Sequence, residues 1–399
     1  MYLTRISISN FRVFNRLDIE VPRRIIMLIG GNAQGKTSFL EALHLFSILT
    51  SFQASSDRQL INFFSLKEML PVARLVMSFN KGNQLRRMEI RLILENGRNG
   101  GMRLRKEVLV DGVKRSLQEA LGNFQSVIFL PQMTSIIEGG PDKRRRYLNI
   151  VISQAYSGYA KILSEYQKAI TQRNALLKQI AERHSSPQQL DYWDELISDR
   201  GASLIYMRIK TILKLEQLAK QVHKDLSNQL EVLRIVYQPS YDPYTKLANQ
   251  NSFKAVSPVG RSKFSKEQIK LGFWEALQKV RREEVLRGVT TIGPQRDEIR
   301  FLINGFDLGI YGSRGQIRSS LLSLKIAEVN WLHDISHEWP VLLLDETMAE
   351  LDLKRRDSLI RVLQKGEQAI LTTIDANQFT DDFVQSCAVW KIKNGRIVV

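Results

Sequence analysis

The chain has 399 residues, of which 58 are Lys or Arg, 41 are Asp or Glu and 43% are hydrophobic. These proportions are typical of a globular protein and exclude collagen-like, fibrous and disordered classes. The aliphatic runs are short, whereas a membrane-spanning helix needs roughly 20 apolar residues, so we expect no membrane partner. A single cysteine, Cys387, permits no internal disulfide, and no signal-peptide pattern opens the sequence. We therefore expect a cytoplasmic protein.

The formal net charge of +17 favours a polyanionic partner, with nucleic acid ahead of an anionic membrane. The positive excess is uneven. Residues 81–115 hold ten Lys or Arg against four Asp or Glu, and residues 254–287 hold nine against four. From residue 340 onward there are eight against nine, so we expect the basic surface upstream of that part.

Alternating apolar and polar residues predict strands over 2–9 and 16–21, and a continuous apolar run predicts a buried strand over 25–29. A glycine-rich turn follows, and residues 38–49 then have helical spacing. Renewed alternation predicts an antiparallel sheet with basic side chains on one face. Its expected strands are 72–79, 85–95 and 102–110.

From residue 159 the hydrophobic period becomes helical. Two helix-length patterns on either side of residues 184–187 favour a short antiparallel helical hairpin, with an ordinary helical subdomain as the alternative. Residues 237–265 are polar and contain three prolines, which indicates a loop or linker. A further helix is expected over 265–286, followed by a turn and a strand over 290–303.

Residues 30–37 fit the pattern G-x-x-x-x-G-K-[ST] at every fixed position. Glycines at 30 and 35 let the backbone wrap closely, so that successive N–H groups point at phosphate oxygens. The helix that follows directs its N-terminal dipole at the same anion. We expect Lys36 to reach the β- and γ-phosphates and Thr37 to offer its hydroxyl to Mg²⁺, so the loop predicts a nucleotide bound with Mg²⁺. The predicted nucleotide-binding residues of this loop are Gly30, Gly31, Asn32, Ala33, Gln34, Gly35, Lys36 and Thr37.

A second predicted buried strand, 341–344, ends in two carboxylates, Asp345 and Glu346. We expect Asp345 to face the Mg²⁺ ion and Glu346 to polarise an attacking water. A core strand that ends in two solvated acids is the alternative. Lys36 and Asp345 stand so far apart in the sequence that a large segment must be inserted between the two halves of the site.

Ser313-Arg314-Gly315-Gln316 precedes an amphipathic helix. A hydroxyl, a glycine backbone and a helix start together make a second anion-binding element, although a plain glycine turn has the same composition. After the two acids comes a loop that ends at Asp352, followed by a strand over 369–373.

In this order the motifs resemble the ABC-type ATPases, and within them the RecF branch. The RecF resemblance covers nearly the whole chain and is carried by five segments, which are Asn10-Phe11-Arg12, Gly30 to Ala42, Phe129-x-Pro131-Gln132, Gly140 to Arg145 and Thr291 to Asp297. Some positions depart from the family pattern. Gln132-Met133 replaces Glu-Asp, Asn149 an Asp, Gln295 a His, Glu346 a second Asp and Ala349 a Ser.

The resemblance implies an α/β fold: an ABC-type ATPase head (P-loop) with an inserted antiparallel β subdomain and an α-helical lobe that contains a short helical hairpin. The expected division is 1–150 and 291–399 for the two halves of the head and 151–290 for the helical lobe. Two chains would sandwich ATP in an ATP-dependent homodimer. The roles implied are Lys36, Asp345 and Glu346 as catalytic residues, Thr37, Asp345 and Gln132 at the metal, Arg12 at ATP, Asp352 in the D-loop, and Ser313, Arg314, Gly315 and Gln316 acting in trans.

The function implied is ATP-dependent DNA binding in recombinational repair and replication. The dimer would close on gaps, junctions or duplex DNA with little sequence preference, and it would open on slow, DNA-stimulated hydrolysis. It would help to load a recombinase through a RecR-like mediator and would support SOS induction. The DNA-binding candidates are Arg86, Arg87, Arg103, Arg105, Arg144 and Arg145.

Three alternatives belong to other classes. An architectural DNA-binding protein with a decayed ATP site is disfavoured by the intact Lys36, Thr37, Asp345 and Glu346. A nuclease of the overcoming-lysogenization-defect kind would need an acidic domain after the head, and the segment after Asp345 is short for one. A transporter ATPase would have a much shorter insertion.

Overall fold

The computed structural model describes residues 1–67, 69–96, 101–246 and 258–398. The chain forms two compact units, of which the first combines Met1–Met133 with Glu328–Val399 and the second is Thr134–Ala327. The three-part division predicted from the sequence stays a prediction. The two units group residues 134–150 and 291–327 with the helical lobe, because α4 (Pro141–Ala155) packs on α5 (Tyr159–Ala181), α6 (Leu190–Leu226) and β10 (Glu298–Ile303).

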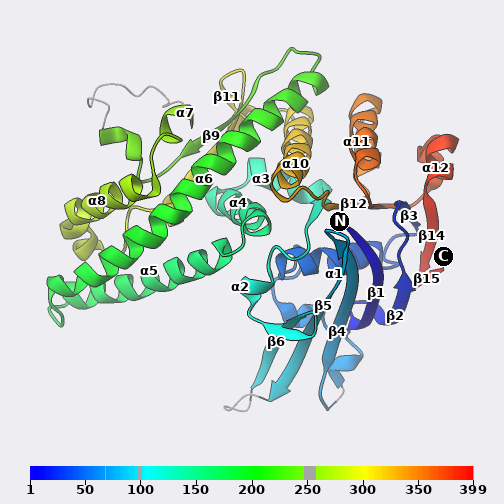
Figure 1. Ribbon diagram of the computed structural model, residues 1–399, viewed down its shortest axis with the longest axis horizontal. Coiled ribbons are helices and arrows are strands. Elements are labelled where there is room, and N and C mark those ends of the chain that lie inside the picture. The colour runs from blue at the N-terminus through cyan, green and yellow to red at the C-terminus, as the bar shows by residue number, and fades with distance from the viewer. Residues whose placement is uncertain (68, 97–100, 247–257, 399) are drawn as a thin grey trace. The chain divides into compact units, whose positions relative to one another are not determined.

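The first unit contains a six-stranded, mostly parallel sheet (Figure 1). All five residues of β12 and the three central residues of β3 are buried, which confirms both predicted buried strands. Only the edge strand β15 runs antiparallel. The strands in spatial order are β15 (Arg396–Val398), β14 (Ala388–Lys393), β3 (Ile25–Ile29), β13 (Ala369–Thr373), β12 (Val341–Asp345) and β8 (Ser126–Phe129).

The same unit holds a six-stranded antiparallel sheet. Along β5, Met88 and Ile90 point into the core and Arg87 and Arg91 to the other face, which confirms the predicted basic face. The strands in spatial order are β2 (Phe14–Glu20), β1 (Tyr2–Phe11), β4 (Val72–Lys81), β5 (Gln84–Asn96), β6 (Met102–Val110) and β7 (Val113–Arg115).

Helix α1 packs against β8, β12 and β13 of the parallel sheet, and its apolar residues join one core shared with the antiparallel sheet. In the described part of the chain, no helix combines the length and the apolar character that a membrane span requires. The helices of this unit are α1 (Lys36–Ile48), α2 (Leu117–Ala120), α11 (Leu353–Lys365) and α12 (Asp381–Ser386).

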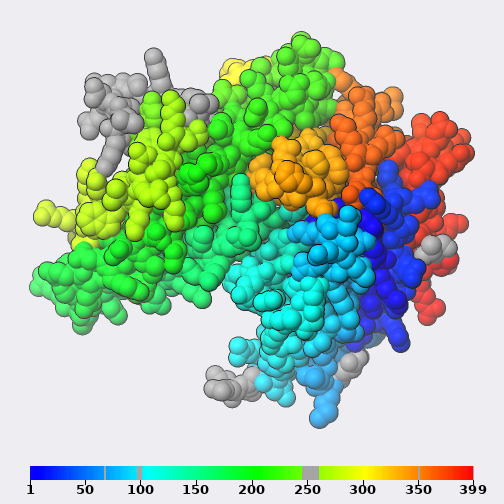
Figure 2. Space-filling view, viewed as in Figure 1, coloured from blue at the N-terminus to red at the C-terminus, as the bar shows by residue number. Residues whose placement is uncertain are grey.

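The second unit is built on the predicted helical hairpin, α5 (Tyr159–Ala181) and α6 (Leu190–Leu226), with α8 (Lys266–Arg287) against both (Figure 1). In the space-filling view, the yellow-green atoms of α8 lie against the green atoms of the hairpin (Figure 2). Close approach requires a glycine at one point of this contact. A Cβ atom on Gly201 of α6 would lie 2.5 Å from the ring of Phe273 on α8. The packing of α5 along α6 confirms the hairpin prediction.

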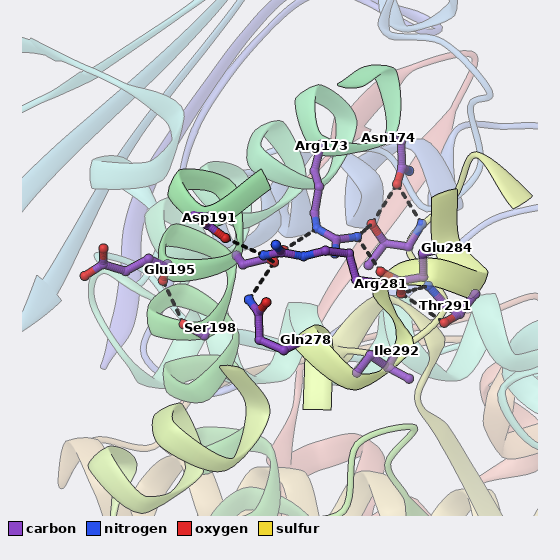
Figure 3. Close-up of polar contacts among 12 residues, drawn as sticks. Arg173, Asn174, Asp191, Glu195, Ser198, Gln278, Arg281, Glu284, Thr291 and Ile292 are labelled. Atoms are coloured by element: carbon purple, nitrogen blue, oxygen red, sulfur yellow. Dashed lines mark hydrogen bonds and ion pairs between the residues drawn. The ribbon is translucent and has the colours of Figure 1, made fainter. Parts of the chain in front are cut away.

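A buried ionic cluster ties the three helices together (Figure 3). Arg173 of α5 donates to Asp194 of α6 at 2.7 Å and pairs with Glu284 of α8 at 2.6 Å, and all three side chains are fully buried. Arg173 also donates to Thr290 at 2.9 Å, and Arg281 pairs with Asp194. Removing one partner from such a cluster leaves an uncompensated buried charge, so the cluster fixes how the helices pack.

A three-stranded antiparallel sheet completes the second unit, with β11 (Phe306–Asp307), β10 (Glu298–Ile303) and β9 (Leu233–Gln238) in that order. The loop predicted over 237–265 is wrong at its ends, because β9 extends to Gln238 and helical turns form at Pro243–Lys246 and Pro258–Arg261 (α7). Its centre, 247–257, lies outside the described residues. The remaining helices are α3 (Ser135–Glu138), α4 (Pro141–Ala155), α9 (Leu308–Tyr311) and α10 (Arg314–Ser336), and α10 continues into the first unit.

Candidate nucleotide-binding site

The loop between β3 and α1 needs its glycines for two different reasons. A Cβ atom on Gly30 would lie 2.6 Å from the carbonyl oxygen of Ile392 on β14, so packing alone excludes a side chain. Gly35 has φ +111°, a left-handed conformation, and its Cβ atom would lie 2.8 Å from Val13. Ala33 also has a positive φ, of 60°. The backbone therefore curls as a phosphate-binding loop requires.

The N-terminus of α1 is left open for an anion. Its cap residue, Gly35, offers no side-chain hydrogen bond, and the first turn holds no acidic residue. The first N–H groups of a helix have no partner within the helix and carry a partial positive charge. With neither cap nor carboxylate to satisfy them, these groups suit a phosphate.

Lys36 lies folded over this loop. Its Nζ donates to the carbonyl oxygens of Gly30 at 2.6 Å and Gly31 at 2.9 Å, and lies 3.0 Å from Oε1 of Glu346. An ammonium group has three donors, and these contacts use all of them. A phosphate oxygen can bind Lys36 only by replacing one of them. We expect the Glu346 carboxylate to be the partner that is replaced, because its side chain is 40% exposed and can turn away, whereas the other two partners are backbone carbonyls of the loop itself.

Asp345, at the end of β12, faces Thr37. Oγ1 of Thr37 donates to one carboxylate oxygen of Asp345 at 2.7 Å, and Oγ1 of Thr372 on β13 donates to the other at 2.9 Å. Burial raises the pKa of Asp345 above its ordinary value, and the two hydroxyl hydrogen bonds oppose that shift. Two hydroxyl groups therefore hold the carboxylate in a fixed orientation at the edge where the phosphate-binding loop begins.

Glu346 has a strained backbone, with φ 48° in the left-handed region. Its N–H donates to Thr372 Oγ1 at 3.1 Å, and the next residue, Thr347, donates to the carbonyl of Phe129 on β8 at 3.0 Å. Non-glycine residues keep such a conformation only where neighbours enforce it. Here these neighbours turn the Glu346 side chain back over the loop towards Lys36.

The donor set fits a magnesium nucleotide. Thr37 and Asp345 bring a hydroxyl and a carboxylate oxygen together, and Mg²⁺ in nucleotide sites is held by one or two such oxygens together with phosphates and water. Within the described ranges, no three His, Cys, Asp or Glu side chains gather to hold a metal ion by themselves. A metal at Thr37 and Asp345 would therefore depend on the phosphates for its remaining ligands.

Arg12, predicted to bind ATP, is committed to a carboxylate of α1. Its Nε and Nη2 donate to the two oxygens of Glu41 at 2.7 and 2.9 Å, and Nη1 donates to the carbonyl of Gln59. Glu41 is buried and also accepts from Ser51. Arg12 is 22% exposed, so its part in nucleotide binding stays a prediction beside a clear structural role.

Gln132 and Asp352, the other predicted residues of the first unit, lie after neighbouring strands of the parallel sheet. Gln132 is exposed in the turn that follows β8, beside β12. Asp352 caps α11 by accepting from the N–H of Arg355 at 2.9 Å and pairs with the side chain of Arg355. The metal role of Gln132 and the D-loop role of Asp352 stay predictions.

The predicted signature segment lies in the second unit, at the start of α10. Ser313, Arg314 and Gly315 are exposed, whereas Gln316 is half-buried and its side-chain amide donates to Glu231 at 2.9 Å. A Cβ atom on Gly315 would meet only the hydroxyl of Ser313, at 3.9 Å. Among the residues that the structure describes, none therefore requires a glycine at position 315.

The predicted DNA-binding arginines of the antiparallel sheet do not all lie on one of its faces. Arg87, Arg103 and Arg105 lie on the outer face of the antiparallel sheet. The register of β5 places Arg86 on the face of Met88, where it pairs with Asp111 at 2.7 Å.

Two further predicted DNA contacts, Arg144 and Arg145 of α4, have partners within the second unit. Arg144 pairs with Glu298 at 2.7 Å, and Arg145 donates to the carbonyl of Asp297 at 2.6 Å. They are only 12% and 18% exposed. Their DNA contacts stay predictions, and their observed contacts join α4 to β10.

The sequence assigned no role to three residues that contact predicted site residues. Thr372, which orients Asp345 and the backbone of Glu346, carries no signal beyond its place at the end of a strand. Glu41 lies within the quoted motif segment, so its spacing from Lys36 could have drawn attention to it. Glu231, which holds Gln316, lies in a region that the sequence left unassigned.

Comparison with known proteins places this geometry in a family. Residues 2–397 match the family described as "RecF/RecN/SMC N terminal domain". The DNA replication and repair protein RecF of Herpetosiphon aurantiacus is 32% identical over 100% of this chain and 99% of its own length. The protein of the same name from Halothermothrix orenii is 33% identical over 100% and 98%, respectively.

Comparison with solved structures leads to the same family. A structure described as the recombination mediator protein RecF with ATP, in the RecFOR pathway, matches with a TM-score of 0.80 at 30% identity and covers 100% of this chain and 98% of its own. The Smc head domain of Pyrococcus furiosus matches with a TM-score of 0.50 at 15% identity over 100% and 96% and supports the fold alone. The predicted fold class is confirmed, and the chain belongs to the RecF family.

Proposed function

We propose that this chain is an ATP-dependent DNA-binding protein of recombinational repair and replication, and that ATP closes a dimer of two chains. The observation that carries the proposal is the assembly of Lys36, Thr37, Asp345 and Glu346 around an open helix N-terminus. The RecF relatives, whose names specify DNA replication and repair and one of whose structures contains ATP, support it.

Each residue of the nucleotide-binding site has its own role in this proposal. Lys36 and the α1 N-terminus bind the phosphates, and Thr37 and Asp345 hold Mg²⁺, which would offset the negative charge of the phosphate oxygens. Glu346, once released from Lys36, accepts a proton from the attacking water. The chain is then a slow ATPase that uses hydrolysis as a switch, with Gln132, Arg12 and Asp352 as further contacts.

The exposed signature segment supports the dimer. Ser313 and Gly315 offer a hydroxyl and an open backbone at the start of a helix, and a nucleotide bound by a second chain would meet them in trans. The direct test is gel filtration or sedimentation of the protein with and without ATP. A chain that stays monomeric with saturating ATP and Mg²⁺ would refute the sandwich.

The outer face of the antiparallel sheet supports DNA binding. Buried Glu89 is shared by Arg74 at 2.7 Å, Arg91 at 2.6 Å and Arg87 at 3.6 Å. Glu107 is likewise shared by Arg105 at 2.7 Å and Lys114 at 2.6 Å. Cations outnumber carboxylates here, so the face keeps a positive surplus for phosphates.

The same carboxylates hold the arginines in place. Burial raises the pKa of Glu89, but the stronger combined effect of the hydrogen bonds and charges of Arg74 and Arg91 lowers it below the ordinary value, so Glu89 stays charged. A cavity of about 300 Å³ opens on this face beside Arg5, Arg74 and Arg87. Phosphate contacts of this kind carry little sequence preference. We expect DNA gaps and junctions as the targets and a RecR-like mediator as the partner. The chain would act on the recombinase indirectly and would support SOS induction. We expect a cytoplasmic location.

A further inference from the structure

The side chain of Gln316, the last residue of the signature segment, is held inside its own unit. Its Nε2 donates to Glu231 Oε1 at 2.9 Å, and its Oε1 accepts from the backbone N–H of Ser313 at 3.0 Å. In return, the backbone N–H of Gln316 donates to Ser313 Oγ at 3.2 Å. Gln316 therefore fixes the conformation of Ser313 and links it to Glu231, between α6 and β9.

Glu231 is in turn paired with a buried histidine in the last turn of α6. Its Oε2 lies 2.9 Å from Nε2 of His223, whose side chain is 0% exposed. The other ring nitrogen, Nδ1, lies 3.2 Å from Oγ of Ser323 on α10. His223 therefore bridges the segment that follows its own helix and the helix that carries the signature.

The contacts return to the signature along α10. Ser323 donates to the carbonyl of Ser319 at 2.8 Å, and Ser319 donates to the carbonyl of Gly315 at 2.7 Å. The hydrogen bonds thus form a closed ring, which leaves the signature at Gln316 and returns to it at Gly315. All of its members belong to the second unit.

The donors and acceptors around Glu231 show that its carboxylate acts only as a hydrogen-bond acceptor. A carboxylate only accepts, so Nε2 of His223 must carry a proton. Nδ1 then either donates to Ser323, as in an imidazolium, or accepts from Ser323 with that hydroxyl turned away from Ser319. In both cases Glu231 accepts from His223 on one oxygen and from Gln316 on the other.

We propose that Glu231 and His223 are positioning residues for the signature segment, which they hold in the conformation that a second chain's nucleotide requires. The inference rests on the proposed sandwich dimer and adds a link to it. α6 has 37 residues, so at ~1.5 Å per residue it spans roughly 55 Å from the hairpin turn to its other end, where His223 lies in the last turn. The signature is therefore anchored to the end of a helix that runs the length of the hairpin.

Two substitutions of Glu231 test whether its hydrogen bonds hold the signature segment. Glu231→Ala removes both acceptors, and we expect ATP-dependent dimerisation to weaken roughly tenfold, the effect of losing a charge-assisted hydrogen bond. Glu231→Gln can still accept from Gln316 and can donate to Nε2 of a neutral His223, so dimerisation should stay near that of the parent. Glu283→Ala, which removes an exposed carboxylate of α8, is the matched control.

Sedimentation at increasing ATP gives the dimerisation constants, and amide hydrogen exchange of the peptide containing Ser313–Gln316 reports on the segment directly. We expect faster exchange in Glu231→Ala and parental exchange in Glu231→Gln and in the control. Nucleotide binding at concentrations below dimerisation should be unchanged, because Lys36 and Asp345 belong to the other unit. Should Glu231→Ala not fold, His223→Phe, which fills the same buried space but removes the donor to Glu231, replaces it with the same expectations.

The proposal is overturned if Glu231→Ala dimerises and exchanges like the parent, or if Glu231→Gln is as impaired as Glu231→Ala. A parent protein that does not dimerise with ATP refutes the proposed function instead. In that case the exchange measurement still decides whether Glu231 holds the segment, so the two failures are distinguishable.

Discussion

Replacing Glu346 by Gln tests the proposed catalytic carboxylate and its contact with Lys36 together. The amide keeps the shape of the side chain but cannot take a proton from water. Loss of a general base typically slows the chemical step ~10²–10⁴-fold. We therefore expect single-turnover ATP hydrolysis by Glu346→Gln to fall within that range.

The structure predicts a second, opposite effect on ATP affinity. Glu346 Oε1 lies 3.0 Å from Lys36 Nζ, and a phosphate must displace it to bind the lysine. Because Glu346 is 40% exposed, solvent screens this ion pair, and exposed pairs are worth ~0.2–1 kcal/mol. Removing the charge should therefore tighten ATP binding roughly 1.5- to 5-fold.

The assay pairs equilibrium ATP binding with single-turnover hydrolysis for the parent, Glu346→Gln and an exposed-carboxylate control, Glu20→Gln. Slow hydrolysis with equal or tighter binding supports both assignments. Hydrolysis at the parental rate would exclude Glu346 as the base and direct attention to Gln132 or Asp352. Markedly weaker binding would show that Glu346 supports the loop and does not compete with phosphate for Lys36.

Further substitutions test the other parts of the molecule. Ser313→Arg should leave ATP binding by the monomer intact and block ATP-dependent dimerisation, and a dimer formed by this variant would contradict the trans role of the signature. Reversing charge at Arg103 and Arg105 together should weaken binding to all DNA sequences and reduce the log–log salt slope by about two, one unit per lost phosphate contact, whereas Arg86→Glu on the other face of the sheet should leave the slope unchanged. Asp194→Ala should cost about 3–5 kcal/mol and lower the Tm of the helical lobe by roughly 6–20 °C, against little change for the exposed partner Asp191→Ala, as differential scanning calorimetry would show.

The sequence predicted best what depends on neighbouring residues. The strand over 25–29, the phosphate-binding loop and the helix after it form one local unit, and all are present with only small shifts of their ends. The basic face of the antiparallel sheet followed from simple alternation, which fixes the face of each side chain along a strand. Alternation also places Arg86 on the face opposite to Arg87, so the sequence already separates these two arginines, and the DNA contact of Arg86 stays a prediction.

The remaining features depend on contacts between distant segments, which one sequence cannot reveal. Gly30 is required by the carbonyl of Ile392, and Arg12 is held by Glu41 and Gln59. Arg144 looked like a free cation in a basic run until β10 placed Glu298 against it. Charge alone therefore overestimates how many arginines remain available to a polyanion.

Gly315 illustrates how a glycine unexplained by its own fold can point to a partner. Glycine in a helix is less stable than alanine by roughly 0.5–1 kcal/mol, and at this exposed position a Cβ atom would meet only Ser313 Oγ at 3.9 Å. Gly315→Ala should therefore leave the folded monomer unchanged or stabilise it by up to that amount in thermal unfolding. If a second chain's phosphates approach this backbone, the same methyl group obstructs them and weakens ATP-dependent dimerisation in sedimentation. A variant that is stabilised and still dimerises like the parent would mean that no phosphate comes close to Gly315.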